Sequence, residues 1–528
     1  MTDIRCDVLI VGSGSAGATI AATLAEYTKL SVVLVEKGPY YGAEFFNQRE
    51  LDMMVLLAQN GGRSTVDGAI PVAGGECVGG GTTVNYALSF DPIPEVWNRW
   101  RRQYSLEGFS FSDSANDYGV EGLNLAAALR DIRKRCNVHA PADSEVNDNN
   151  GLFMDGCRSL GVSAKKYELN MQGCIGCGFC GQGCAYDAKR GTMVTYLQDA
   201  LRDGVRLIHH CSIDQIHFES AGSELRAVGA SGTIAPTKTG SRPNSAPSGP
   251  ISIDAKLVIV SAGAIESPAL LHRSNVPDPF DRIGRGLVLH PSLPIAGVFD
   301  HEIVNYRGIT GSYYSDYFYA DHGFMLECLF DHPIDAAIAL PGFGVDHFDL
   351  MRDYSKLAGF GAMLVDTPSD SNRVSWSAAS GTPQIAYRLS DPDKARLRFA
   401  AARMVEIIFA SGAREAILTS HEPLTPRGNA IFQSASEAGF CEKLTFAPNE
   451  TLVSSAHAQA SVKMSENPHL GMANSRGEVH GVSGLIVCDS SAFPTSCGAN
   501  PMIAIMSLAR YQGRRIAGEQ GRYVAGRL

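Results

Sequence analysis

The chain has 528 residues, 45% of them hydrophobic and 19% charged, a balance typical of a folded globular protein rather than a disordered one. Acidic residues outnumber basic ones by 55 to 45 and form no basic stripe with them, which argues against nucleic acid as a partner. No apolar run is long enough to predict a transmembrane helix, and the first residues lead straight into a strand without a signal peptide, so we expect a cytoplasmic protein.

The first predicted element is a buried strand over residues 6–11, CDVLIV, followed by three spaced glycines, a helical segment and a second apolar strand that ends at Glu36. This β-α-β order is typical of a dinucleotide-binding unit. Gly12 allows the tight turn, Gly14 lets the backbone approach a diphosphate, and Gly17 lets the helix pack on the strand. Glu36 can accept hydrogen bonds from an adenosine ribose. The unit by itself does not distinguish NAD from FAD.

A second glycine-rich segment, GGECVGGG, occupies residues 74–81. Five glycines in eight positions cannot belong to a helix or a strand interior, so they predict a backbone that passes close to something. A flexible surface loop would have the same composition, and the residues around the segment decide between the two.

Four of the thirteen cysteines fall within eleven residues, at Cys174, Cys177, Cys180 and Cys184. This is the spacing of ferredoxin-type iron–sulfur ligation. We therefore expect a cluster, [4Fe-4S] if Cys184 completes it and [3Fe-4S] if it does not. A structural zinc, or a metal-free loop that is reduced or disulfide-linked, is the alternative.

The segments farther along the chain are less specific. Residues 231–250, dense in Gly, Pro, Ser and Thr, predict an exposed loop between two strands. The aromatic run over 306–324 suits a substrate pocket and ordinary packing equally well. Residues 372–389 predict a hairpin, and an amphipathic helix follows over 393–410, closed by Gly412.

Four stretches, taken in order, resemble the glucose-methanol-choline (GMC) oxidoreductase family. Residues 79–85, GGGTTVN, resemble its glycine-rich segment beside the flavin. Residues 257–276 resemble its central signature, in which a strand leads to the cofactor and Ser267-Pro268 opens a helix; residues 283–291 resemble the segment after it. The C-terminal block, 480–516, matches through Gly484, Asp489, Pro494, Gly498, Asn500 and Pro501.

The resemblance implies an α/β fold, in which a Rossmann-type FAD-binding domain is interleaved with an α+β substrate domain. The FAD-binding domain would comprise 1–90, 155–295 and 450–528, with a cysteine-rich loop at 173–185, and the lid and substrate domain would comprise 91–154 and 296–449. The hairpin strands would belong to the substrate-domain sheet. Some members attach the flavin through a histidine where this chain has Val84, so non-covalent FAD is expected.

The same resemblance implies which residues serve the cofactor and the reaction. The expected cofactor-binding residues are Gly12, Gly14, Gly17, Glu36, Gly80, Gly81, Thr82, Asn85, Ala262, Gly263, Asp489, Asn500 and Pro501. His457 stands where the family keeps its active-site histidine, and Asn500 at its partner position. The residues after His457 depart from the family pattern, with Ala458 and Gln459 where many members have glycine and Ser or Thr nearby. A helix after Pro501 would direct its positive N-terminus toward the flavin.

The predicted reaction is removal of a hydride from a primary or secondary alcohol, with His457 as the base and Asn500 orienting the substrate oxygen. The cysteine spacing predicts that electrons leave through the cluster to a one-electron redox partner. The alternatives are an oxidase that reduces oxygen to peroxide and has a metal-free cysteine loop, and a non-catalytic FAD protein. No motif constrains residues 296–450, where the substrate determinants are expected, so the alcohol is not predicted.

Overall fold

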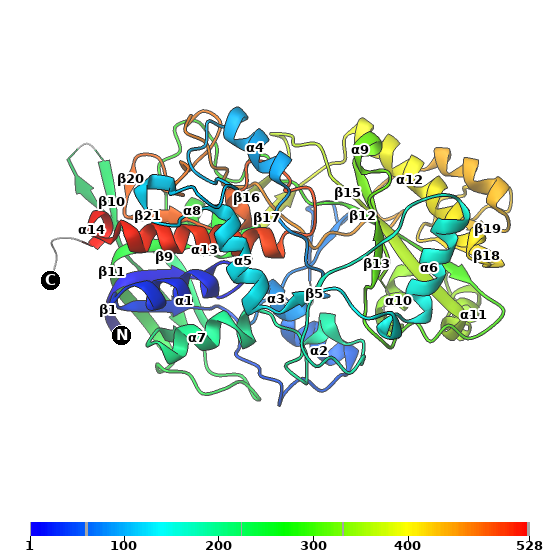
Figure 1. The fold of residues 1–528 in the computed structure, drawn as a ribbon, viewed down its shortest axis with the longest axis horizontal. Coiled ribbons are helices and arrows are strands. Elements are labelled where there is room, and N and C mark those ends of the chain that lie inside the picture. The colour runs from blue at the N-terminus through cyan, green and yellow to red at the C-terminus, as the bar shows by residue number, and fades with distance from the viewer. Residues whose placement is uncertain (1, 59–61, 223, 330–331, 525–528) are drawn as a thin grey trace.

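The computed structural model describes residues 2–58, 62–222, 224–329 and 332–524. It has two main sheets, which lie at opposite ends of an elongated molecule (Figure 1). The first sheet has eight strands in the order β20-β10-β11-β1-β2-β8, with β21 paired to β11 and β9 to β10. Its strands are β1 (Thr2–Val11), β2 (Val32–Val35), β8 (Arg206–Ile208), β9 (Cys211–Ala221), β10 (Glu224–Ile234), β11 (Gly249–Val260), β20 (Val482–Ser483) and β21 (Leu485–Val487).

The N-terminal unit forms as predicted, because its apolar run is central in this sheet. β1 pairs in parallel with both β11 and β2, and Val8, Leu9 and Ile10 are fully buried. The strand begins at Thr2, earlier than the apolar run suggested, because its first residues extend the pairing with β11. Helix α1 (Gly17–Tyr27) follows and packs against α7 (Tyr196–Arg202) and α13 (Met502–Gly518), which lie beside it in Figure 1.

The second sheet has seven strands in the order β19-β18-β12-β15-β14-β13-β6. They are β6 (Lys165–Lys166), β12 (Ser292–Val298), β13 (Tyr313–Ser315), β14 (Phe324–Glu327), β15 (Leu357–Leu364), β18 (Glu415–Leu418) and β19 (Ile431–Phe432). Helix α12 (Asp391–Ala410), predicted from its periodicity, begins at the Ser390 N-cap and packs on β12, β15 and β18. The two sheets have separate hydrophobic cores, in agreement with an α/β fold of two interleaved parts.

The remaining helices and short strands connect and cover these sheets. The helices are α2 (Glu50–Leu57), α3 (Gly81–Val84), α4 (Pro94–Gln103), α5 (Leu125–Arg135), α6 (Asp148–Ser159), α8 (Gly263–Arg273), α9 (Tyr319–His322), α10 (Pro333–Ala339), α11 (Val345–Arg352) and α14 (Gln520–Val524). Two-stranded pairs are formed by β3 (Arg63–Ser64) with β4 (Pro71–Val72), and by β5 (Val138–His139) with β7 (Leu169–Asn170).

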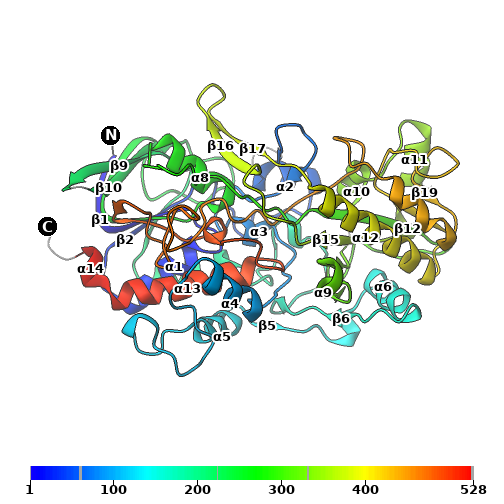
Figure 2. The same ribbon diagram turned by 90° about the horizontal axis from the view of Figure 1, so that it is seen from above.

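Two expectations about secondary structure were wrong. The predicted hairpin exists as β16 (Arg373–Ser377) and β17 (Thr382–Ala386), but it is a separate two-stranded sheet rather than part of the substrate-side sheet. It packs on α8, where the Arg273 guanidinium covers the ring of Trp376. The hairpin projects from the molecule in Figure 2. Helix α8 begins at Gly263 rather than at Ser267-Pro268, because Gly263 adopts a positive φ that turns the chain from β11 directly into the helix.

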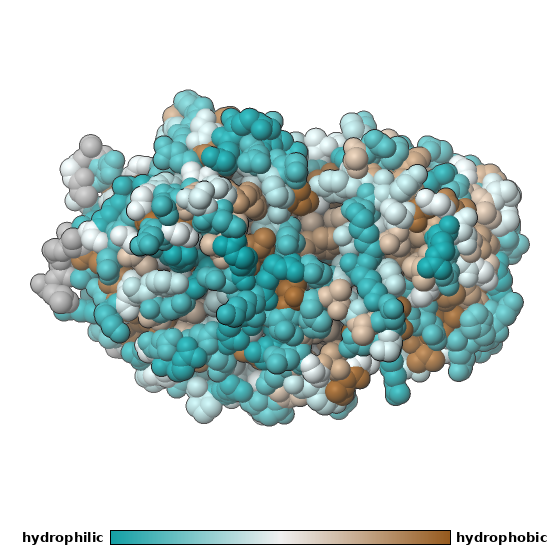
Figure 3. Space-filling view, in the orientation of Figure 1, coloured by the Kyte–Doolittle hydropathy of each residue, from teal (hydrophilic) through white to brown (hydrophobic). Residues whose placement is uncertain are grey.

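The surface and the loops agree with a folded globular chain. The face seen in Figure 3 is mainly hydrophilic, with hydrophobic residues scattered over it. Within the described residues, no helix is both long enough and apolar enough to cross a bilayer. The predicted loop between two strands is shorter than 231–250, because β10 continues to Ile234 and β11 begins at Gly249.

Candidate functional site

The glycines of the N-terminal fingerprint lie where backbone segments touch. Gly12 has φ +101°, and a Cβ there would lie 2.4 Å from the Ser261 carbonyl oxygen. A Cβ on Gly17 would lie 1.8 Å from the Gly12 oxygen. At Gly14 a Cβ would be in ordinary contact, 3.9 Å from the Gly80 Cα. The fingerprint therefore contacts two other segments. One is Ser261, which follows β11, and the other is the second glycine segment at Gly80.

Glu36 follows β2 directly and lies in the same corner. Its carboxylate accepts hydrogen bonds from the Ser13 N–H at 3.0 Å, the Ser13 hydroxyl at 2.7 Å and the Gly38 N–H at 2.9 Å. Burial raises its pKa. The Ser13 hydroxyl also accepts from the Gly79 N–H at 3.2 Å, so Ser13 joins Glu36 to the glycine-rich segment.

The C-terminal block contacts the chain just after β11, where α8 begins. Asp489 is buried and accepts hydrogen bonds from the Gly263 N–H at 2.8 Å, from the Ser267 hydroxyl and from Ser491. Burial raises the pKa of Asp489. The carboxylate thus holds the first residue of α8 beside the C-terminal block.

The second glycine segment is ordered, and not a flexible loop. Gly81 begins the short helix α3, and the Thr82 hydroxyl donates to the Gly79 oxygen at 2.8 Å. After the helix, the Asn85 amide lies 2.9 Å from the Met502 sulfur in the first turn of α13. Pro501 caps α13, so the predicted helix after it is present. The segment therefore connects the fingerprint to the N-terminus of α13.

These contacts fit a flavin dinucleotide. Backbone from three distant parts of the chain converges at glycines, and a side chain at these positions would fill the space between the segments. A bound diphosphate requires such open space next to backbone. The buried carboxylate of Glu36, just after β2, could bind a ribose. The N-terminus of α13 lies near the second glycine segment. The expected cofactor residues are thus brought together. Their individual contacts with FAD stay predictions.

His457 lies in the loop over 452–461, half-buried beside the exposed Ala456. Burial lowers its pKa to about 4, so its imidazole is neutral at neutral pH. Among the described residues, neither of its ring nitrogens has a hydrogen-bond partner. An uncharged imidazole with a free nitrogen can accept a proton from a substrate.

A second histidine, His290, lies against His457 and was not singled out from the sequence. The two rings meet edge to face with their centroids 5.5 Å apart, and the His290 ring hydrogen bonds the Ser496 hydroxyl. Burial and the neighbouring His457 hold the pKa of His290 well below its usual value. The only sequence signal was its place in the family segment 283–291.

Gln459, at the position that departs from the family pattern, connects the loop of His457 with the segment that leads to Asn500. Its side-chain oxygen accepts from the Cys497 N–H at 2.9 Å, and its amide donates to the His457 carbonyl at 3.1 Å. The departure therefore has a structural role. His457 and Asn500 are brought into one region through this bridge.

Asn500 is buried and its Oδ1 has no hydrogen-bond partner in the described structure. Near it lies a buried carboxyl that sequence reasoning missed, that of Glu327, the last residue of β14. Burial raises the pKa of Glu327 to about 7. No sequence motif marks Glu327, because only the pairing of β14 within its sheet places it beside the C-terminal block.

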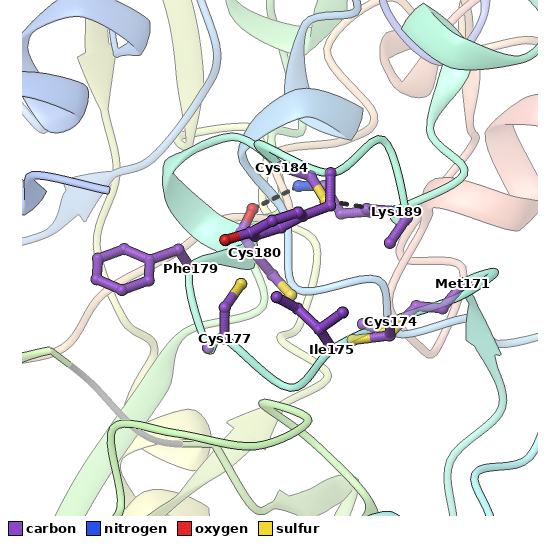
Figure 4. A pocket seen from close by; sticks show the side chains of 11 residues that line it. Met171, Cys174, Ile175, Cys177, Phe179, Cys180, Cys184 and Lys189 are labelled. Carbon is purple, nitrogen blue, oxygen red and sulfur yellow. Dashed lines mark hydrogen bonds between the residues drawn. The ribbon is translucent and has the colours of Figure 1, made fainter. Parts of the chain in front are cut away.

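The four clustered cysteines line one pocket, together with Met171, Ile175, Phe179 and Lys189 (Figure 4). All four are free, and the described residues contain no group of three or more His, Cys, Asp or Glu side chains arranged to hold a metal ion. The expected iron–sulfur cluster is therefore not supported in the described part of the chain. Lys189 is buried beside them and donates to the Thr83 and Asn85 carbonyls at 2.7 Å each and to the Cys180 carbonyl.

Comparisons with known proteins define the class. Two models of the GMC oxidoreductase family match residues 6–292 and 368–509, together more than half of the chain. The chain belongs to the GMC oxidoreductase family, as its motifs predicted.

Among individual proteins, the chain is 29% identical to an uncharacterised GMC-type oxidoreductase of Mycobacterium tuberculosis, over 96% of this chain and 75% of that protein. It is 28% identical to a long-chain-alcohol oxidase of Arabidopsis thaliana, over 96% of this chain and 66% of the plant enzyme. Its fold is similar to that of pyridoxine 4-oxidase from Mesorbium loti, with a TM-score of 0.66 and 17% identity over 97% of this chain and 99% of that one. Formate oxidase has the same fold, with a TM-score of 0.67 and 14% identity over 99% of this chain and 100% of that one.

Proposed function

We propose that this protein is an FAD-dependent oxidoreductase that oxidises a primary or secondary alcohol. The observation that carries the proposal is the neutral imidazole of His457, held beside the segment of Asn500 where the glycine-rich backbone segments converge. Bound there without a covalent link, FAD would accept the hydride from the carbinol carbon.

His457 is the proposed base. Loss of a hydride from an alcohol is facile only if the hydroxyl proton leaves at about the same time, and the free ring nitrogen of His457 can take it. The His290 ring and the Gln459 amide support the loop on which His457 lies. In this proposal the Asn500 amide orients the reacting oxygen without competing for its proton.

The N-terminus of α13 contributes electrostatically. Its unpaired N–H groups carry partial positive charge and begin immediately after Asn500 and Pro501. Such a fixed dipole stabilises negative charge that accumulates on a neighbouring group as electrons arrive.

We further propose a long-chain alcohol as the substrate. Ala499, next to Asn500, packs with Met325 and Met363, and aromatic and aliphatic side chains line the same cluster, namely Phe90, Ile93, Tyr314 and Tyr319. Apolar walls beside a polar reacting end suit a molecule with a hydroxyl at one end of a hydrocarbon. The similarity to plant long-chain-alcohol oxidases supports this class.

For the electron acceptor we propose oxygen, in line with the oxidases among the similar proteins. The second candidate is transfer through an iron–sulfur cluster to a one-electron partner, and the ferredoxin-like cysteine spacing favours it. Against it, the described residues contain no metal-binding group of cysteine side chains.

Anaerobic mixing with a long-chain primary alcohol tests the proposal. We expect the flavin absorbance to bleach, and to recover with peroxide release when oxygen is admitted. His457→Ala should slow bleaching by on the order of 10², the usual worth of a positioned base, at unchanged FAD content. No bleaching with any alcohol would refute the proposal. Three or four irons per chain in protein purified without air, with slow oxidation by oxygen, would favour the cluster.

A further inference from the structure

His290 is a buried histidine that lies against His457 and takes no part in the proton transfer described above. Its Nε2 has two neighbours, the Ser496 hydroxyl and the Gln459 Nε2, the latter at 3.3 Å. Its Nδ1 is buried and has no hydrogen-bond partner in the described part of the chain. A neutral imidazole carries one hydrogen, and the groups around the ring determine which nitrogen holds it.

The orientation of the Gln459 amide is fixed by backbone groups at both of its ends. Its Oε1 accepts from the Cys497 N–H at 2.9 Å, and its Nε2 donates to the His457 carbonyl at 3.1 Å. A backbone N–H can only donate and a carbonyl can only accept, so the amide turned end for end would lose both bonds. The Gln459 atom that faces His290 is therefore the amide nitrogen, which can only donate.

The Ser496 hydroxyl is fixed in a similar way. It accepts from the Gly498 N–H at 3.0 Å, so its own hydrogen is free to donate to His290. The His290 Nε2 thus faces two donors and has to offer its lone pair, which places the ring hydrogen on Nδ1. Because no described residue bonds Nδ1, no contact at that end of the ring opposes this tautomer.

We propose that Gln459 is a positioning residue that keeps His290 in its Nδ1–H tautomer and so makes His457 the proton acceptor of the histidine pair. The inference rests on the proposed alcohol oxidation, in which the hydroxyl proton leaves beside two imidazoles that are in contact. The lone pair of His290 is engaged by two donors, and a proton added there would break both hydrogen bonds. The proton therefore goes to the free ring nitrogen of His457 and does not pass on to His290.

The backbone of His290 is held independently of the Gln459 side chain. Its φ is +52°, and the Asp366 carboxylate accepts from the His290 N–H at 3.1 Å and from the Leu289 N–H at 2.9 Å. The Tyr387 hydroxyl donates to the same carboxylate at 2.6 Å. A substitution at residue 459 should therefore change the hydrogen on the His290 ring and leave its backbone in place.

The other titratable groups beside the pair do not compete for the proton. Burial raises the pKa of Tyr387 well above its usual value and that of Cys497 to about 12, so both stay uncharged. Asp366 faces the backbone of His290 and not its ring. Burial and the neighbouring His457 hold the pKa of His290 well below its usual value, in agreement with a ring that stays neutral.

The first test determines the tautomer directly and needs no substrate. Nitrogen NMR of the FAD-loaded protein with isotope-labelled histidine should show His290 with its hydrogen on Nδ1 and a lone pair on Nε2. Its signals are assigned by their absence from His290→Asn, because asparagine tolerates a positive φ. In Gln459→Glu at alkaline pH, an ionised carboxylate replaces the donating amide and can only accept, so the hydrogen should move to Nε2.

Two further variants control this result. Ser496→Ala removes one donor but leaves the Gln459 amide, so the hydrogen should stay on Nδ1. Gln215→Glu makes the same change at an exposed position of β9 and should leave the His290 signals as they are. A wild type with the hydrogen on Nε2, an unchanged tautomer in Gln459→Glu, or a moved hydrogen in Ser496→Ala would overturn the proposal whatever the enzyme oxidises.

The second test follows flavin reduction by a long-chain alcohol against pH. A carboxylate at residue 459 favours a second proton on His290 and so raises its pKa. The charged ring then lies with its centroid 5.5 Å from that of His457, where it opposes the positive charge that His457 gains with the proton. Below the raised pKa, reduction in Gln459→Glu should be slower than in the wild type by on the order of tenfold, and it should recover as the pH rises.

The shape of the pH profile separates this effect from a loosened site. A variant that was merely loosened would be slower at every pH, so a Gln459→Glu profile with the wild-type shape would overturn the proposal. Gln215→Glu should keep the wild-type profile. A wild type whose flavin is bleached by no alcohol would contradict the proposed function instead, and the NMR test would still decide the role of Gln459.

Discussion

At the scale of single residues, the fingerprint glycines differ in what they do. Gly12 and Gly17 are needed by the fold, since a Cβ at either would meet backbone oxygen. Gly14 is not, because its φ is ordinary and its Cβ would have room. The absence of a side chain at Gly14 keeps the space between the fingerprint and Gly80 free. We propose that the diphosphate lies in this space.

This difference gives a prediction that separates folding from cofactor binding. We expect Gly14→Ala to leave the melting temperature of the FAD-free protein unchanged and to weaken FAD binding by on the order of tenfold or more, about 1.4 kcal/mol, because the methyl group would contact the diphosphate. FAD titration followed by flavin fluorescence measures the change. Gly12→Ala is the contrast, and should lower the melting temperature without FAD as well. Normal FAD affinity in Gly14→Ala would show that the diphosphate lies elsewhere.

At the scale of elements, the cysteine loop and the second glycine segment form one unit through Lys189. Its ammonium group is buried and donates to carbonyls of both segments. Burial lowers its pKa to about 8. The structural role of the loop is therefore to brace the segment beside the proposed flavin site, whatever the redox role of its thiols.

Replacement of Lys189 should lower the stability of the protein. Lys189→Met would leave buried carbonyls unpaired, at about 1–3 kcal/mol for each unsatisfied group. We expect a lower melting temperature and reduced FAD content after purification. The matched control is Lys165→Met, which removes a half-exposed lysine paired with Asp316 and should change neither quantity measurably. Equal melting temperatures for the two variants would contradict the bracing role.

At the scale of the whole molecule, the proposed FAD site is assembled from segments at both ends and in the middle of the chain. A ligand bound at such a junction stabilises every part that contributes to it. The site offers no attachment point at Val84, whose side chain packs against Gly75 and carries no nucleophilic atom.

Two measurements test these whole-molecule consequences together. Acid or heat denaturation should release intact FAD into the supernatant, and the FAD-loaded protein should melt at a higher temperature than the FAD-free protein, by an amount that grows with FAD concentration. Flavin that remains with the precipitated polypeptide would show a covalent bond and refute the non-covalent assignment.

The amino-acid sequence alone determined the N-terminal β-α-β unit, the helix after Pro501 and family membership, because each depends on local patterns. Strand apolarity and helix periodicity are local, and glycines are required wherever backbone must pass close by. The helix after β11 was misplaced by four residues, because one positive φ at Gly263 outweighed the proline signal. The proposed division into domains stays a prediction.

Only the tertiary structure decided what surrounds the reacting groups. His290 packs against His457, and Gln459 bonds Cys497, across more than thirty positions of the chain, and no local pattern encodes such neighbours. The cysteine spacing gave the opposite case: it matches a cluster motif and the four side chains line one pocket, but the described residues contain no metal-binding group. Spacing along a chain limits which side chains can meet, whereas backbone direction and packing decide which of them do.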